Sequence, residues 1–230
     1  MPSEIAVIVG VGQGLSAALA RGCAERGMSV VLAARNIEKL SALASETDAR
    51  LIACDATDRR QVDALFHVVG AMGAPVLVVY NASYRNRGPF VALDAGEVAR
   101  TLEVTALGGF HVGQAAARMM LPLGRGSIFF TGASASVKGY AQSAPFAMGK
   151  FALRGLAQSM ARELSPQGLH VAHFVIDGGI SRGAQDTRRD RGPDGLLEPA
   201  AIAETYLYVH DQPRNAWSWE IELRPSVEVF

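Results

Sequence analysis

The stretch SIFFTGASASVKGYAQSAPFAMGKFALRGLAQSMARELS, residues 127–165, contains a strand, a loop and a helix in succession. Residues 127–131 form a short apolar run between two glycines, which predicts a strand buried on both faces. Along residues 145–164 the apolar side chains recur at helical spacing, and Pro166 ends that pattern. A buried strand followed by a helix is the repeating unit of a parallel sheet covered by helices.

The same alternation continues along the whole chain. Apolar runs predict further strands at residues 5–9, 30–34, 50–54, 76–80, 170–176 and 217–223, and helical periodicity predicts helices at 15–25, 37–46, 59–69, 95–121 and 198–208. The long helix at 95–121 is expected to be weakened at Gly108 and Gly109. The pattern predicts an α/β fold with a doubly wound, Rossmann-like parallel sheet of about seven strands and helices on both faces. Residues 1–230 are expected to form one domain, with residues 182–210 as a short substrate lid.

A glycine-rich turn follows the first predicted strand. Gly10, Gly12 and Gly14 lie between that strand and the helix that begins at Leu15. Such glycines let the backbone approach a pyrophosphate, and a helix N-terminus supplies N–H groups and a positive dipole end. The turn therefore indicates dinucleotide binding, although a glycine turn without a nucleotide remains an alternative.

The end of the second predicted strand bears on the choice of cofactor. Folds that select NAD place an acidic residue there for the ribose hydroxyls. Here Ala33 and Ala34 occupy those positions and Arg35 follows. Because an arginine can pair with a 2′-phosphate, the sequence favours NADP(H) over NAD(H). A solvated surface arginine is the alternative interpretation.

The opening stretch resembles the active-site segment of the short-chain dehydrogenase/reductase family. In that family a Tyr one helical turn before a Lys gives or takes the proton, and the Lys holds the nicotinamide ribose and lowers the Tyr pKa. In this chain the Lys is Lys150, the Tyr position is Phe146, and the family's Ser position is Ala133, with Ser134 beside it. The resemblance implies an altered acid–base machinery, for which we select Lys150, Ser134 and Tyr140 as candidate catalytic residues.

Further patterns of the family follow in the expected order: Asp55-Ala56, Asn81-Ala82 and Gly178-x-Ile180. The resemblance implies that the first contacts the adenine, the second passes the ribose, and the third lies beside the nicotinamide. Thr105 stands where the family has an Asn that supports a proton relay behind the Lys. The residues after Asp55 also fit a plain helix cap at Thr57 or Asp58.

Two functional hypotheses follow, beside a third in which the protein is a structural oligomer that has lost its affinity for the cofactor. The first is a short-chain oxidoreductase that transfers hydride between NADP(H) and an unknown small carbonyl, alcohol or activated alkene. The alternative is a non-catalytic NADP(H)-binding pseudoenzyme or partner subunit. Restoring Tyr and Ser at the two altered positions would separate the first two hypotheses.

Bulk properties narrow the classes of partner. The formal net charge is zero, so neither nucleic acid nor an anionic membrane is expected. No apolar run approaches the ~20 residues that cross a bilayer. Cys23 and Cys54 are expected to be core thiols in a reducing, cytoplasmic setting, and His173 and His210 have no visible partner. No metal site is predicted, and small residues on the helices at 95–121 and 146–165 favour a homodimer or homotetramer.

Overall fold

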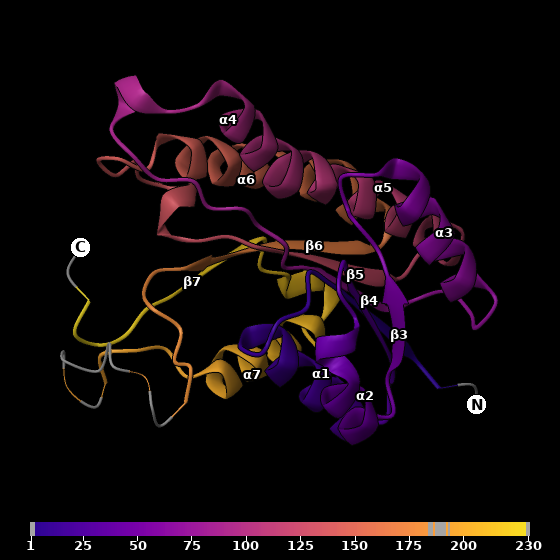
Figure 1. Cartoon of the computed structure of the whole chain (residues 1–230). Helices are drawn as coiled ribbons and strands as arrows, with labels where there is room; N and C mark the ends of the chain where they lie inside the picture. The colour runs from indigo at the N-terminus through magenta and orange to yellow at the C-terminus, as the bar shows by residue number, and fades with distance from the viewer. Residues whose placement is uncertain (1–2, 184–185, 187–191, 193, 229–230) are drawn as a thin grey trace.

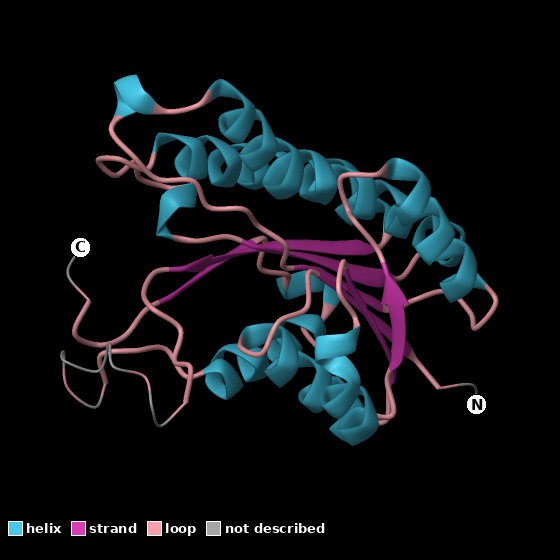
Figure 2. Ribbon diagram, viewed as in Figure 1, coloured by secondary structure: helices cyan, strands magenta, loops and turns pink. Residues whose placement is uncertain are grey.

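Seven parallel strands form one twisted sheet in the computed structural model, which describes residues 3–183, 186, 192 and 194–228. The order is β3-β2-β1-β4-β5-β6-β7, so the chain reverses direction across the sheet between β1 and β4. This is the predicted doubly wound fold (Figure 2). The strands are β1 (Ile5–Val9), β2 (Ser29–Ala34), β3 (Arg50–Ala53), β4 (Leu77–Tyr80), β5 (Gly126–Thr131), β6 (Leu169–Ile176) and β7 (Glu220–Leu223).

Helices cover both faces of the sheet (Figure 1). One face carries α1 (Leu15–Glu25), α2 (Ser41–Thr47) and α7 (Pro199–His210); the other carries α3 (Arg59–Gly70), α4 (Ala95–Leu102), α5 (Gly108–Met120) and α6 (Ala144–Leu164). Each face has its own apolar core, and β1, β4 and β6 are buried along their whole length. Among the described residues, the structure contains no helix with the length and apolarity that a bilayer span requires.

The predicted long helix at 95–121 is divided into three parts. A π-helical turn, Glu103–Leu107, separates α4 from α5 and lies just before the glycines where we expected the weakness. The hydroxyl of Tyr80 donates a hydrogen bond to the carbonyl of Val104 inside this turn. A Cβ on Gly108 would lie 2.4 Å from the same hydroxyl, so the glycine makes room for the tyrosine rather than breaking the helix.

The last strand is shorter than the sequence indicated. It begins at Glu220, and Trp217 lies before it, stacked on His170 with ring centroids 4.7 Å apart. Trp219 packs against the α6-side core, whereas Ile221 and Leu223 pack against the opposite core. Trp219 and the pair Ile221 and Leu223 therefore lie on opposite faces of the sheet, because regular strand alternation starts only after the tryptophans.

The segment expected to be a lid contains a core helix. Residues 199–210 form α7, whose Ile202 and Tyr206 are buried against the sheet and α1. Residues 199–210 therefore belong to the core of the fold. That the preceding loop forms a substrate lid stays a prediction. Residues 184–185, 187–191 and 193 of that loop lie outside the described residues.

Candidate active site

A cleft of about 1210 Å³ opens at the carboxyl ends of the central strands. It brings together several predicted cofactor residues: Gly10, Gly12, Gly14 and Leu15 from the turn after β1, Asn81 after β4, and Gly178 and Ile180 after β6. In open α/β sheets, the crevice where the strand order reverses is the usual ligand site. The structure therefore brings these predicted residues together at one cleft, and their cofactor-binding role stays a prediction.

The glycine turn and the turn after β4 touch each other. Gly10 has φ +85°, and a Cβ there would lie 2.3 Å from the backbone nitrogen of Ala82, so only glycine fits. Asn81 donates from Nδ2 to the hydroxyl of Ser16, 2.6 Å away, and its backbone N–H donates to Val9. Ser16 stands where the family pattern has its last glycine, and its hydroxyl ties the two turns together. Sequence reasoning missed this contact.

The beginning of α1 faces the cleft without a side-chain cap. Gly14 is the N-cap residue and makes no side-chain hydrogen bond. A Cβ built on Gly12 or Gly14 would meet no atom within 4 Å, so the space beside both residues is open. Uncapped N–H groups beside open space are suited to an anion such as a pyrophosphate. These residues therefore fit the phosphates of a dinucleotide.

The predicted adenosine-side residues lie at neighbouring strand ends, outside the cleft lining. Arg35 is exposed and directly follows β2, whose Ala33 carbonyl accepts the N–H of Gly10. Asp55 follows β3, and its Oδ1 accepts from the backbone and hydroxyl of Thr57, while Ala56 is buried. Asp58 caps α3 by accepting from the N–H of Arg60, which confirms the cap interpretation. Asp55 thus orders its own turn and does not cap α3.

Lys150 is buried on α6, with only 3% of its surface exposed. Its Nζ donates to the carbonyl of Thr131, the last residue of β5, at 2.6 Å. Burial alone lowers the pKa of Lys150 to about 7. Phe146 lies one turn earlier on the same helix face, and Lys150 Nζ is 5.9 Å from its ring centroid. The lysine therefore borders an apolar ring where the family has a hydroxyl.

A partly buried ionic group lies on the same side of the sheet as Lys150. His173 Nδ1 is 3.1 Å from Glu220 Oε2, and Arg154 donates to both oxygens of Glu220. Desolvation lowers the pKa of His173 to about 4, with Lys150 among the smaller causes. The opposite ring nitrogen of His173 is buried without a partner among the described residues. The expectation that His173 and His210 lack partners is wrong, since His210 Nδ1 contacts the Ser127 hydroxyl at 2.8 Å.

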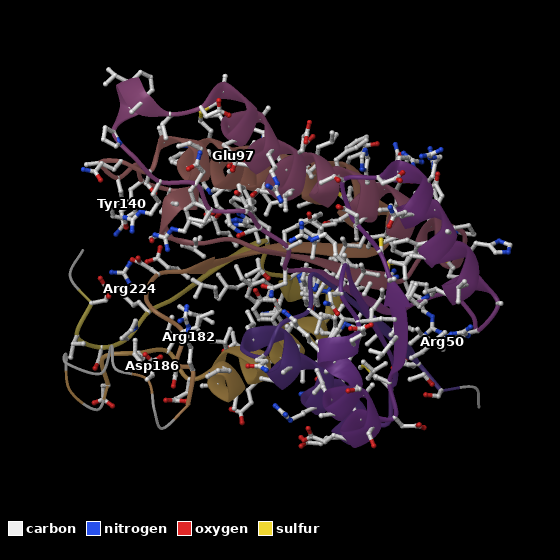
Figure 3. All side chains as sticks on the ribbon, in the orientation of Figure 1. Arg50, Glu97, Tyr140, Arg182, Asp186 and Arg224 are labelled. Carbon is white, nitrogen blue, oxygen red and sulfur yellow. The ribbon has the colours of Figure 1, made fainter. Side chains whose placement is uncertain are left out.

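The two other candidate catalytic residues, Ser134 and Tyr140, occupy the loop between β5 and α6. Ser134 is half-buried in a short 3₁₀ turn, and Tyr140 is 44% exposed with the ammonium of Lys138 over its ring. Neither residue lines the cleft, and their catalytic role stays a prediction. Figure 3 shows Tyr140 at the same end of the molecule as Arg182 and Arg224.

Asp177, which stands where the family has Pro, fixes this loop to the sheet. Its carboxylate is 3.3 Å from Lys138 and 3.4 Å from Arg224. Thr105, which stands at the family's Asn position, is fully buried in the π turn. Its side chain packs against Gly149 and accepts the N–H of Tyr84 at 3.4 Å. Thr105 is therefore used for packing α6 against the π turn.

The parallel sheet, the glycine turn and the cleft between them define a dinucleotide-binding α/β protein. The family model described as short chain dehydrogenase matches residues 4–190, and the chain belongs to this family. A short-chain dehydrogenase from Rhodopseudomonas palustris is 33% identical, with a TM-score of 0.85 over 96% of this chain and 98% of that one.

A metagenomic short-chain oxidoreductase in complex with NADP is 26% identical, with a TM-score of 0.83 over 97% of this chain and 98% of that one. An uncharacterized oxidoreductase of Staphylococcus aureus (strain USA300) is 27% identical over 98% of both chains. The chain is accordingly an oxidoreductase of the short-chain dehydrogenase type, a family that binds NAD(P).

Proposed function

We propose that the protein transfers hydride between NADP(H) and a small carbonyl, alcohol or activated alkene, with an acid–base machinery that differs from its family's. The observation that carries this proposal is the position of Lys150. It lies in the family's register on α6, buried and hydrogen-bonded to the last residue of β5, and it is not among the residues that line the cleft.

The residues present fit the cofactor. The turn at Gly10–Gly14 and the start of α1 would hold the pyrophosphate, because they offer open space and uncapped N–H groups. Asp55, Ala56, Asn81 and Ala82 would border the adenosine half, and Gly178 and Ile180 the nicotinamide half, as the family resemblance implies. A bound nicotinamide supplies or accepts the hydride.

Arg35 supports NADP(H) as the preferred form. Its side chain is exposed at the end of β2, beside the glycine turn, and the acidic residue that recognises the ribose of NAD is replaced by alanine. A guanidinium there would pair with the 2′-phosphate. The related metagenomic oxidoreductase, which was solved with NADP, agrees with this choice.

Lys150 is also the best-supported proton donor or acceptor. A pKa of about 7 suits general acid–base catalysis at neutral pH, and Phe146 supplies no proton. Loss of the tyrosine hydroxyl removes a contribution of typically ~10²–10⁴-fold, so carbonyl reduction should be slow. An activated alkene would place less demand on a proton donor at the carbon that accepts the hydride.

The test is a titration with NADPH and NADH that follows cofactor fluorescence. We expect NADPH to bind more tightly than NADH, and Arg35→Ala to weaken NADPH binding by about tenfold while leaving NADH unchanged. Arg50→Ala is the matched control, because the exposed Arg50 begins β3 beside Val31 of β2, at the amino ends of the strands and away from the carboxyl ends where the cleft opens. Equal affinities, or an Arg35→Ala variant that binds NADPH like the parent, would contradict the NADP(H) preference.

Hydride transfer is tested by the loss of NADPH absorbance over a panel of aldehydes, ketones and activated alkenes. The double variant Phe146→Tyr with Ala133→Ser restores the family residues and should reduce carbonyls faster than the parent. If neither protein oxidises NADPH with any member of the panel, the proposed activity is wrong.

Assembly as a homodimer or homotetramer is part of the proposal. Large apolar side chains of the π turn, α5 and α6 are exposed on one layer of helices: Leu107, Phe110, Met148 and Phe151. Exposed apolar side chains on helices that share one face of the sheet support an interface between copies of the chain.

A further inference from the structure

Arg85 lies over the ring of Phe146, at the residue that replaces the family's tyrosine. The guanidinium carbon is 5.0 Å from the ring centroid, and Lys150 Nζ is 5.9 Å from the same centroid. A benzene ring attracts cations but accepts no strong hydrogen bond, so it leaves the donors of both groups available. The altered catalytic position is thus bordered by two basic groups.

Arg85 has no acidic partner in the part of the chain that the structure describes. Two acids, Glu97 and Asp177, are engaged elsewhere: Glu97 with Tyr84 and Arg100, and Asp177 with Lys138 and Arg224. Partial burial and repulsion from Arg87 lower the pKa of Arg85 from its ordinary value. A bound anion would relieve both effects, because it pairs with the charge and offsets the neighbouring arginine.

Arg85 also lines the cleft that the proposed cofactor would occupy, together with Asn81, Ser181 and Arg182. The acidic residues of the cleft, Glu25, Glu198 and Glu204, come from α1 and the start of α7, on the other face of the sheet from α6. The cleft also contains Arg21 and Arg26 of α1, but these are paired with Glu46 and Asp211, whereas Arg85 lines the cleft without such a pair among the described residues.

We infer that Arg85 is a substrate-binding residue that recognises a carboxylate, so the substrate is a carbonyl, hydroxy or enoic acid whose reacting carbon lies beside Phe146. This inference rests on the proposed function, because it assigns the substrate class of the same cleft. A planar guanidinium matches a carboxylate with two parallel hydrogen bonds, which a hydroxyl or amide does not offer.

The experiment measures binding without turnover. The chain is saturated with NADP⁺, which cannot reduce a ketone, and is titrated by calorimetry with 4-acetylbenzoate, levulinate and the corresponding uncharged amides. We expect at least one acid to bind about tenfold or more tightly than its amide. Arg85→Gln should abolish that preference and Arg85→Lys should retain part of it. Arg87→Gln, the matched control on the same loop, should keep it.

Three results would overturn the inference: no acid binds more tightly than its amide, the preference survives in Arg85→Gln, or Arg85→Gln weakens NADP⁺ itself as strongly as the acids. The last result would make Arg85 a cofactor-binding residue instead of a substrate-binding one. The proposed function fails separately, when NADPH is not oxidised by 4-formylbenzoate or by any uncharged aldehyde, ketone or activated alkene of the panel. If acids bind more tightly than amides but NADPH is not oxidised, the carboxylate site at Arg85 stands and the proposed hydride transfer is wrong. If NADPH is oxidised but acids show no preference, the hydride transfer stands and the carboxylate site is wrong.

Discussion

Replacement of Lys150 by methionine should change how stability depends on pH. In the folded chain burial holds the Lys150 pKa at about 7, against an ordinary value of 10.5. Between these values the unfolded chain carries one more proton than the folded chain, so the free energy of unfolding rises with pH. The destabilisation by Lys150 is therefore largest below pH 7 and fades toward pH 10.5. Methionine fills a similar volume and does not titrate.

The magnitude follows from the two pKa values. Linkage gives a gain of about 3 kcal/mol in the free energy of unfolding of the parent chain from about pH 6 to about pH 9.5, from Lys150 alone. The other ionisable groups are shared by parent and variant, and His173, with a pKa of about 4, stays neutral across this range. The hydrogen bond from Lys150 to Thr131 is lost at every pH and costs about 1 kcal/mol.

The assay is urea unfolding followed by the fluorescence of Trp217 and Trp219, at several pH values in that range. Lys150→Met should be more stable than the parent at the acidic end, and the two curves should converge toward the basic end. Lys39→Met is the control, because Lys39 is exposed and its substitution should leave the slope unchanged. If parent and Lys150→Met show parallel pH profiles, Lys150 is not a neutralised buried amine and its proposed acid–base role loses its support.

Gly10→Ala should destabilise the fold by about 3 kcal/mol or more, since it combines a left-handed backbone with a clash against the turn after β4. Gly12→Ala should leave the melting temperature nearly unchanged and weaken NADPH binding, because its Cβ points into open space. Glu220→Gln should lower stability by about 1–3 kcal/mol through loss of a half-buried charged pair. Glu46→Gln, at the exposed pair with Arg21, should lower stability less than Glu220→Gln does. Phe151→Glu should give a monomeric mass by light scattering; an unchanged mass would place the interface elsewhere.

The sequence predicted elements well where a local pattern determines them. The strand at Ile5–Val9 and the helix at Leu15–Glu25 have the predicted bounds, because glycines limit an apolar run on one side and a periodic run begins on the other. The π turn was not predictable, since it depends on the hydroxyl of Tyr80, a residue of another strand. Nor was the bond from Asn81 to Ser16, which joins residues 65 positions apart.

The candidate site also contains residues to which a local sequence motif points and residues whose contacts depend on distant parts of the chain. Its glycine turn and Gly178–Ile180 segment carry their role in the backbone, so a motif locates them. The roles of Lys150 and His173 depend on burial and on partners from distant strands, which no spacing in the sequence reveals. Arg85 was visible only as one of two loop arginines, and its position over Phe146 required the folded chain.

The departures from the family pattern are consistent with one another in electrostatic terms. A lysine beside a tyrosine stabilises the phenolate, and that negative charge in turn favours the protonated lysine. With Phe146 in place of the tyrosine, no phenolate lies beside Lys150, and His173, held neutral by burial, adds no charge there. Glu220, the acid on that side of the sheet, is already paired with Arg154. Under the proposed function, Lys150 therefore takes the part of the family's tyrosine as the group that holds and releases the proton. Carbonyl reduction should consequently slow as the pH rises through about 7, because the protonated amine is the donor.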